Sequence, residues 1–274
     1  TDALAFPKGN EVFHVTSTTP SMTIKWSSFG SNVAKVKLEY WNTNDNAGAG
    51  GWRTIKSDID NPNHGSGSAN LNSYIWTTTS PEPLPLDLAS TGIKFRVTAS
   101  TPDQPDTALV SPTFAICGDL LVTAPAQGAI LIADGATANT ISWNVFGKVD
   151  TVTILYSRVD QTDFPMELVS TISAEAGDAA ANKGAYAWTI PIAPGTNNDF
   201  ITRVGIGDKS YIRVQDTSSF GVYVRDDSSD FKVKGRLRII APSSATLSDG
   251  LNCATYYTIT WERDGRINAV NIKY

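Results

Sequence analysis

One strand-and-turn motif occurs three times in this chain. Its copies span residues 22–30, 140–147 and 258–265, and each contains an Ile-x-Trp step followed by a glycine. The tryptophans of successive copies lie 117 and then 118 residues apart. A regular period of this length indicates one repeated structural unit, and it matches a complete small domain better than a solenoid repeat. The chain of 274 residues is therefore expected to contain more than one hydrophobic core.

Each copy continues into a second strand in which apolar and polar residues alternate. These strands are Val36-x-Leu38-x-Tyr40, Val152-x-Ile154-x-Tyr156 and Val270-x-Ile272-x-Tyr274. Alternation with period two places one face of a strand in a core and the other in water. Pro7, Pro125 and Pro242 stand upstream of the three tryptophans, where proline suits an edge strand or the entry to a sheet.

Further apolar segments follow in the first two copies. They are 74–76 and 186–188, then 95–97 and 212–214, and finally 114–116 and 231–233. The total is about seven short strands in each unit, joined by connections rich in Gly, Pro and Asn. This pattern predicts an all-β chain of tandem antiparallel β-sandwiches of the immunoglobulin-like or fibronectin III-like type.

The repeat also sets the expected domain boundaries. Residues 1–117 form the first repeat, residues 118–234 the second, and residues 235–274 the first strands of an incomplete third. A single glycine, Gly118 or Gly235, separates the last strand of one repeat from the first strand of the next. Such a connection predicts a semi-rigid junction instead of a flexible Gly/Ser tether.

The third repeat lacks the later strands of the other two. Its segment exposes Ile259, Trp261 and the strand 270–274 on one face, and a unit this small buries too little surface to fold alone. Two explanations stay open: the protein continues in a longer chain, or another subunit supplies the strands by β-augmentation. At the other end, Thr1 follows neither an initiator Met nor a signal peptide, so we expect a processed or trimmed amino terminus.

The order of these motifs resembles one known family. It is similar to the immunoglobulin-like repeat of the yeast cell-wall synthesis proteins, a Ser/Thr-rich surface protein family whose repeat also occurs in large microbial surface proteins. The similarity is clearest in the second copy, at residues 186–191, 211–214 and 226–231. The first copy departs from it at residues 77–80, where Thr-Thr-Thr-Ser replaces the Thr-Ile-Pro step. The resemblance implies a secreted or cell-surface location and a non-catalytic role.

Composition and motifs exclude several classes of function. The net charge of −5 and the pI near 5.0, without a local Lys/Arg cluster, do not suit nucleic acid. No apolar run approaches the roughly 18–20 residues of a membrane span. His14 and His64 have no spacing suited to zinc or to a Ser-His-Asp triad, and the sequence has no Gly-x-Ser-x-Gly elbow or phosphate-binding glycine loop. We therefore predict no enzymatic activity and no cofactor.

Cys117 and Cys253 are the only cysteines of the chain. The predicted boundaries place them in different repeats with a whole sandwich between them, which is too far for an intramolecular disulfide. Each is therefore either a buried thiol or a partner in an intermolecular disulfide.

Two loops carry weak signals for calcium. Asp226, Asp227 and Asp230 lie near the expected end of the second repeat, where their carboxylates could gather a cation. Their alternative role is a turn at the entry to a strand, since Asp and Ser favour turns. Residues 42–48 resemble a calcium loop, but Arg53 stands where the bidentate carboxylate belongs, which favours a plain hairpin loop.

The tryptophans divide into two groups. Five of the seven lie at repeat-equivalent positions and are predicted to be core residues, namely Trp26, Trp76, Trp143, Trp188 and Trp261. Trp41 and Trp52 have no counterpart in the second repeat and flank the loop at residues 42–51. Trp41 follows the inward Tyr40, so period two turns it outward. The two rings either cover each other across the hairpin, anchor a protein partner or stack on a sugar ring.

Together these features favour a non-catalytic extracellular structural or adhesive repeat protein. We expect it at the cell surface, as a subunit or segment of a filament or sheath. The expected partners are further copies of itself or neighbouring surface proteins. Two alternatives stay open: a carbohydrate-binding or cell-wall-associated module that binds cell-wall glycans, and an accessory part of a larger secreted enzyme.

Overall fold

The structure is a computed structural model of the chain. It describes residues 4–16, 20–28, 33–43, 45, 48–63, 71–86, 88–100, 108–158, 160–178, 182–190, 209–242, 256–264, 267 and 269–273. The chain forms two compact units. The first comprises Thr1–Leu120, Val145–Asp150 and Ser218–Val224, and the second comprises Leu121–Asn144, Thr151–Thr217 and Arg225–Tyr274.

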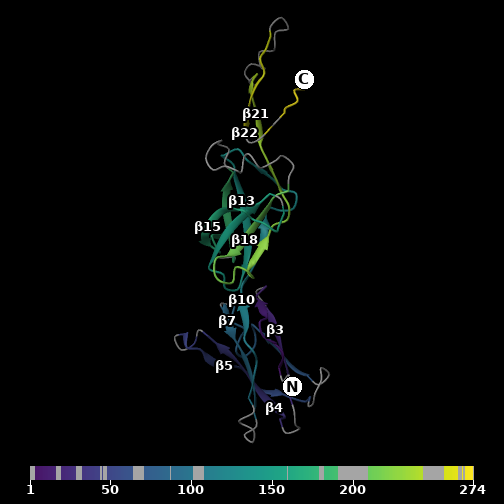
Figure 1. The fold of residues 1–274 in the computed structure, drawn as a ribbon, viewed down its shortest axis with the longest axis vertical. Coiled ribbons are helices and arrows are strands. Elements are labelled where there is room, and N and C mark those ends of the chain that lie inside the picture. The colour runs from purple at the N-terminus through teal and green to yellow at the C-terminus, as the bar shows by residue number, and fades with distance from the viewer. Residues whose placement is uncertain are drawn as a thin grey trace. The chain divides into compact units, whose positions relative to one another are not determined.

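The described strands of the first unit form three sheets (Figure 1). One sheet has the order β1 (Leu4–Phe6), β3 (Ser21–Ser27) and β6 (Leu71–Thr77). A second has the order β5 (Gly51–Asp60), β4 (Lys35–Asn42), β8 (Phe95–Ala99) and β9 (Ala108–Val110). The third has the order β2 (Val12–His14), β10 (Phe114–Cys117) and β7 (Ser90–Ile93), in which β2 and β10 are parallel.

The second unit repeats this plan. One sheet has the order β11 (Asp119–Ala124), β13 (Ala138–Phe146), β17 (Lys183–Thr189) and β16 (Gly177–Asp178). Another has the order β15 (Met166–Ser173), β14 (Thr151–Ser157), β18 (Tyr211–Asp216) and β19 (Arg225–Asp227). The parallel pair is β12 (Ile130–Ile132) with β20 (Lys232–Lys234), and a separate antiparallel pair joins β21 (Arg236–Ala241) to β22 (Thr260–Asp264).

The predicted fold class is confirmed by this strand order. In each unit an Ile-x-Trp strand lies inside one sheet, and the strand that contains Tyr40 or Tyr156 lies inside another. Two mainly antiparallel sheets around one core are the architecture of an immunoglobulin-like sandwich. The described residues include no helix of the length and hydropathy that a membrane crossing requires.

The central strands form because their apolar residues recur at every second position. Along β3 the side chains of Met22, Ile24 and Trp26 are buried, and the residues between them are exposed. Along β13 Ile141 and Trp143 are buried, and Ser142 between them is half-buried. Because successive side chains of a strand point to opposite faces, each strand has one face in the core.

In each unit aromatic side chains join the sheet that contains the Ile-x-Trp strand to the sheet that contains β4 or β14. In the first unit Tyr40 and Trp76 have ring centroids 4.8 Å apart, and the ring of Phe95 meets Trp76 edge-on at 5.8 Å. In the second unit Tyr156 and Trp188 have centroids 5.4 Å apart. Large aromatic rings bury much apolar area and pack in tilted or edge-to-face contacts, so they dominate cores of this size.

The buried indoles also have hydrogen-bond partners. Trp26 Nε1 donates to Asn61 Oδ1 at 3.0 Å, and Trp143 Nε1 donates to the backbone oxygen of Ala174 at 2.8 Å. In both units the acceptor lies beyond the second alternating strand, so the tryptophan fixes a connection of the chain as well as filling the core. Satisfied indole N–H groups allow full burial without a desolvation penalty.

The core prediction is correct for four of the five repeat-equivalent tryptophans and wrong for the fifth. Trp26, Trp76, Trp143 and Trp188 are at most 4% exposed, whereas Trp261 is 41% exposed. Among the described residues β22 pairs with β21 alone, and no second sheet covers its apolar side. The predicted strand at 270–274 is also not formed, since residues 269–273 lie outside any strand and Tyr274 lies outside the described residues.

Gly184 on β17 gives a test of the packing between strands. It lies directly opposite Trp143, and a Cβ at this position would overlap both the indole ring of Trp143 and the backbone oxygen of Ala174. We expect Gly184→Val to lower the free energy of unfolding by about 2–3 kcal/mol, because the added side chain displaces the core indole. Urea denaturation of the whole chain measures this.

Ala187→Val is the matched control, since Ala187 is exposed on the same strand. A β-branched residue suits an exposed strand position, so the change should stay within about 0.5 kcal/mol. Equal effects of the two substitutions would contradict the packing described here.

Candidate functional site

Trp41 and Trp52 form a cross-strand pair on the first unit. They lie directly opposite each other on β4 and β5, with ring centroids 5.3 Å apart and an interplanar angle of 74°. Both side chains are half-buried. The edge-to-face contact means that the rings cover each other across the hairpin, which is one of the three roles that the sequence left open.

Arg96 on β8 lies over the ring of Trp52. Its guanidinium carbon lies 4.3 Å from the centroid of that ring, and its Nε donates to Glu39 Oε2 at 2.7 Å. Lys37 approaches the other carboxylate oxygen at 3.0 Å. Burial alone would raise the pKa of Glu39, but hydrogen bonds and charges from Arg96 and Lys37 outweigh it and hold the pKa below its usual value.

The second unit contains the same arrangement with different residues. Arg213 on β18 has its guanidinium carbon 4.1 Å from the ring centroid of Phe164, and it donates to both carboxylate oxygens of Asp227 at 2.6 and 2.8 Å. Arg96 and Arg213 occupy equivalent positions in the two repeats. An arginine stacked on an aromatic ring and paired with a carboxylate is thus a recurring part of the fold, and Trp52 shares this role with Phe164.

The hairpin loop between β4 and β5 is organised by Asp45. Arg53 donates to both carboxylate oxygens of Asp45, at 2.8 and 2.7 Å, and the Asn42 side chain donates to one of them at 3.1 Å. The backbone N–H groups of Gly48 and Gly50 donate to the backbone oxygen of Asp45. In the loop whose sequence resembles a calcium loop, the carboxylate of Asp45 therefore pairs with Arg53.

Arg53 extends this network toward the core. It also approaches Glu82 at 3.3 Å, and Glu82 accepts a hydrogen bond from the Tyr40 hydroxyl at 3.3 Å. Burial and the nearby charge of Glu82 raise the pKa of Tyr40 to about 12. The phenol therefore stays protonated and serves as a structural donor at neutral pH.

The acidic run at the end of the second repeat is engaged in structural contacts. Asp226 accepts a hydrogen bond from the backbone N–H of Val122 at 2.7 Å, and Asp227 is held by Arg213. The backbone oxygen of Asp230 accepts from Gly128 at 2.7 Å. Within the ranges that the structure describes, no group of three or more His, Cys, Asp or Glu side chains could hold a metal ion.

Cys117 is a buried thiol at the end of β10. Its Sγ lies 3.7 Å from His14 Nδ1 and 3.9 Å from the backbone oxygen of Phe13. His14 Nδ1 is also 3.9 Å from a carboxylate oxygen of Asp119. Both contacts use the same ring nitrogen, so these residues do not form the relay of a Cys-His-Asp triad. Cys253 and His64 lie outside the described residues.

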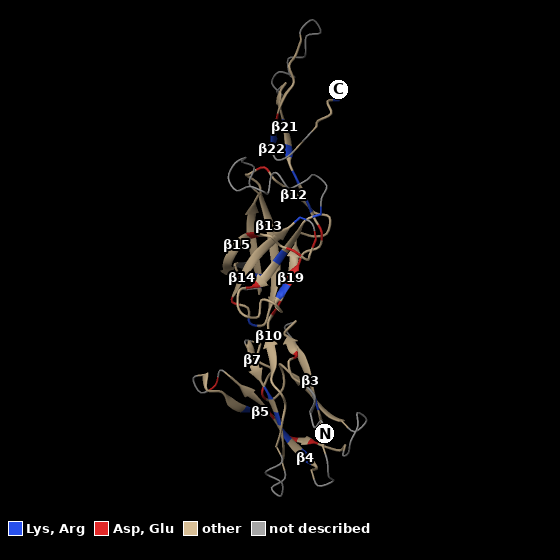
Figure 2. Ribbon diagram, in the orientation of Figure 1, with Lys and Arg blue, Asp and Glu red and all other residues tan. Residues whose placement is uncertain are grey.

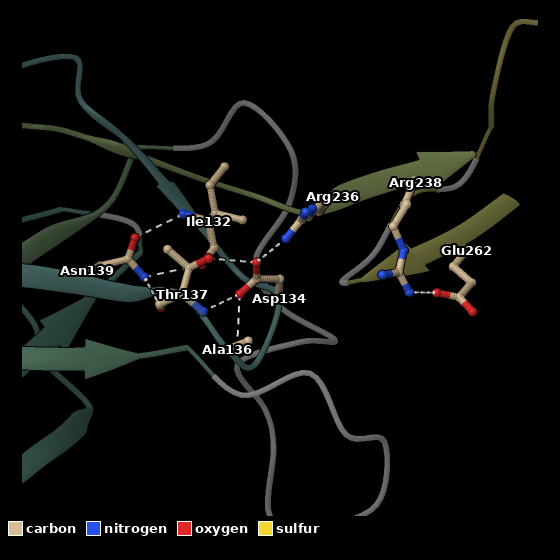
Figure 3. A network of polar contacts seen from close by, with 8 residues as sticks. All are labelled: Ile132, Asp134, Ala136, Thr137, Asn139, Arg236, Arg238 and Glu262. Atoms are coloured by element: carbon tan, nitrogen blue, oxygen red, sulfur yellow. Dashed lines mark hydrogen bonds and ion pairs between the residues drawn. The ribbon is translucent and has the colours of Figure 1, made fainter. Parts of the chain in front are cut away.

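A buried polar network lies next to the start of β21 (Figure 3). Asp134, whose side chain is 2% exposed, accepts hydrogen bonds from the backbone N–H of Ala136 and from both the N–H and the hydroxyl of Thr137. Arg236 donates to the same carboxylate at 3.0 Å. These bonds, led by the Thr137 N–H, hold the pKa of Asp134 well below its usual value.

The sequence alone did not identify these polar networks. The sequence did contain one signal for the arginine contacts. Arg96 and Arg213 occupy equivalent positions in the two repeats, and each stands between two apolar residues of a strand. Asp134 and Arg236 offered no such signal, since their contact joins residues 102 positions apart. Figure 2 marks the positions of Lys and Arg and of Asp and Glu on the ribbon, and both kinds occur along the described strands.

Comparison with known proteins gives no family. No protein-family model matches the chain, and no curated protein matches it.

Solved structures resemble the chain only in general fold. The fibronectin(III)-like modules of Clostridium thermocellum CbhA share 13% identity over 85% of this chain and 94% of theirs, with a TM-score of 0.24. A chimeric titin Z1Z2 tandem shares 13% identity over 85% of this chain and all of its own length, with a TM-score of 0.26. The polymeric Ig receptor ectodomain of a teleost fish shares 9% identity over 82% of this chain and 96% of its own, with a TM-score of 0.29. Scores this low carry no argument, so the fold assignment rests on strand order.

Removing the charge of Arg96 tests how much its ion pair with Glu39 stabilises the first unit. Arg96→Met leaves the buried carboxylate of Glu39 with Lys37 as its remaining ion-pair partner, so we expect the free energy of unfolding to fall by about 1–3 kcal/mol. Lys35→Met is the control, because its pair with Asp60 is largely exposed and should contribute less than about 1 kcal/mol. Urea denaturation compares the two; a larger effect of Lys35→Met would contradict the role of Arg96.

Asp134 should make the second unit sensitive to acid. Its pKa is lower in the folded state than the unfolded value of about 3.9, so its stabilisation is present above that pH and is lost as the pH falls below it. We therefore expect Asp134→Asn to lower the melting temperature at pH 7 and to flatten its decline below pH 4. Asp150→Asn, in an exposed pair with Lys148, is the control. Parallel acid profiles for Asp134→Asn and the unmodified chain would refute this assignment.

Proposed function

We propose that this chain is a non-catalytic structural or adhesive module of a cell-surface protein, acting as a subunit or segment of a filament or sheath. One observation supports the proposal. The sandwich is repeated, and in both units charged side chains pair with one another and stabilise the fold. The charged residues around Trp52 and Phe164 are paired with one another in both units, as described above. Side chains held in this way support a rigid scaffold and leave little for reaction chemistry.

The proposed organisation keeps the repeat boundaries at residues 1–117, 118–234 and 235–274. The third segment would be the first strand pair of a further sandwich, since β21 and β22 pair as β1 and β3 do. The motif resemblance to the repeat of the yeast cell-wall synthesis proteins supports an extracellular location. Repeated sandwiches suit that location because they span distance with stable, similar units.

Carbohydrate binding is the second candidate. Trp41 favours it, because this ring is half-buried, has no counterpart in the second repeat and lies beside the hairpin loop. A partly exposed ring can stack on a sugar. The edge-to-face contact with Trp52 reduces the face that Trp41 could offer, so the structural role is preferred.

Immunogold labelling of intact cells that make the protein tests the proposal. We expect label on the outer surface, associated with regular polymers in electron micrographs of the native material. Brief treatment of cells with external protease should remove the label. Label confined to the cytoplasm would refute the proposed location and role.

Glycan binding separates the two candidates. The chain should show no saturable binding to soluble cell-wall glycans in calorimetry. Saturable binding that Trp41→Ala abolishes and Trp188→Phe preserves would favour the second candidate, since Trp188 is a core residue of the second unit and lies in a different sheet from β4.

A further inference from the structure

The first compact unit extends beyond the first repeat. It includes two connections of the second repeat, Val145–Asp150 and Ser218–Val224. The former leads from the end of β13 into β14, and the latter leads from β18 to β19. Val145, Val149 and Val224 are at most 8% exposed. Apolar side chains are buried to this extent only where other groups pack over them, so both connections contribute to the packing of the first unit.

Two glycines lie where the connection at residues 145–150 meets the end of β10. A Cβ added to Gly147 would lie 2.9 Å from the Cβ of Val15 and 3.2 Å from the Cα of Gly118. A Cβ added to Gly118 would lie 2.7 Å from the backbone oxygens of Phe146 and Lys148. The two segments are therefore too close together for a side chain at either glycine.

Backbone conformation accounts for only one of these glycines. Gly147 has a φ of +67°, which favours glycine whatever surrounds it. Gly118 is not among the described glycines with a positive φ, so its backbone conformation would accept other residues. The close approach of residues 146–149 is therefore the reason for a glycine at position 118.

Val15 links this contact to the parallel pair of β2 and β10. Its side chain is fully buried in the core of the first unit. Its backbone N–H donates to the backbone oxygen of Cys117 at 3.0 Å, which extends the pairing of β2 with β10 by one residue. The connection at residues 145–150 thus caps the end of this pair, where local opening of a strand pair can start.

Small residues recur at the same three places one repeat later. Displaced by 118, 117 and 118 residues from Val15, Gly118 and Gly147, they are Ala133, Gly235 and Gly265. The N–H of Ala133 donates to the backbone oxygen of Lys234 at 2.8 Å, as that of Val15 does to Cys117. Gly265 lies outside the described residues. The recurrence in the sequence indicates that the pair of glycines belongs to the plan of the repeat.

We propose that the connection at residues 145–150 holds the β2–β10 pair closed, so that each repeat stabilises the closing strands of the repeat before it. Val15 and Gly118 form the receiving surface. The segment that fits it has a glycine four residues after the tryptophan of the Ile-x-Trp step, as Gly147 follows Trp143. Both sides of the contact lie in the first compact unit. Stability in such a chain depends on neighbouring repeats as well as on each repeat alone.

Glycine substitutions in the whole chain test this contact. Hydrogen exchange is followed by mass spectrometry in peptides that cover Val15 and Ala115, whose amides are bonded within the β2–β10 pair. We expect Gly147→Ala and Gly118→Ala each to speed this exchange about tenfold or more, because the added methyl group displaces the connection and the pair opens more often. Exchange in β4 and β8 of the same unit should not change.

Gly128→Ala is the matched control for backbone strain. Gly128 has a φ of +71°, close to that of Gly147, but no atom lies within 4 Å of its added Cβ. The control therefore adds similar strain without overlap, and exchange at Val15 and Ala115 should keep its original rate. Gly118→Ala is the complementary case, since it adds overlap at a position without a positive φ.

Three results would overturn the proposal. They are unchanged exchange at Val15 and Ala115 in either test variant, an equal increase in Gly128→Ala, and faster exchange confined to residues 138–157. If Gly147→Ala does not fold, Gly118→Ala decides alone. The measurement is independent of the surface labelling, so the cap on the β2–β10 pair and the proposed function can fail separately.

Discussion

The contact between the tryptophan of the Ile-x-Trp strand and the strand beside it organises each sandwich. Trp143 is fully buried because Gly184 opposite it has no side chain and because Ala174 accepts its indole hydrogen bond. In the first unit Trp26 reaches the same burial with Asn72 opposite and Asn61 as the acceptor. One side chain therefore ties together the centre of a sheet, its neighbour and a connection, and its burial depends on all three.

The sequence predicted those features that depend on local pattern. The alternation in β3 and β13 identified the strands, and the recurring positions of Trp26 and Trp143 identified the core. The prediction that Trp261 is a core residue was wrong, because the burial of a side chain depends on the strands and sheet that pack against it. The same Ile-x-Trp pattern is 41% exposed at Trp261, where no described sheet covers it. A periodic strand specifies which face is apolar but cannot specify whether that face is covered.

The polar networks could not be predicted from the sequence for a different reason. Arg96 meets Trp52 and Glu39 only after three strands take their register, and irregular pairing between β4 and β5 shifts that register. Asp134 and Arg236 form a hydrogen bond although they are 102 residues apart in the sequence. Charged pairs of this kind depend on tertiary placement, and strand propensity carries no information about it. The recurrence of Arg213 over Phe164 shows that the arrangement is a property of the repeat.

Each unit also closes with a parallel pair between an early and a late strand. In the first unit residues Val12 to His14 lie beside Ala115 to Cys117, and in the second Ile130 to Ile132 lie beside Lys232 to Lys234. When the two ends of a unit are pulled apart, parallel strands at those ends slide along each other. All hydrogen bonds of the pair are then loaded together, and none can open singly from one end. Mechanical resistance of each unit would therefore reside in these few bonds, and their rate of rupture would set its lifetime under tension.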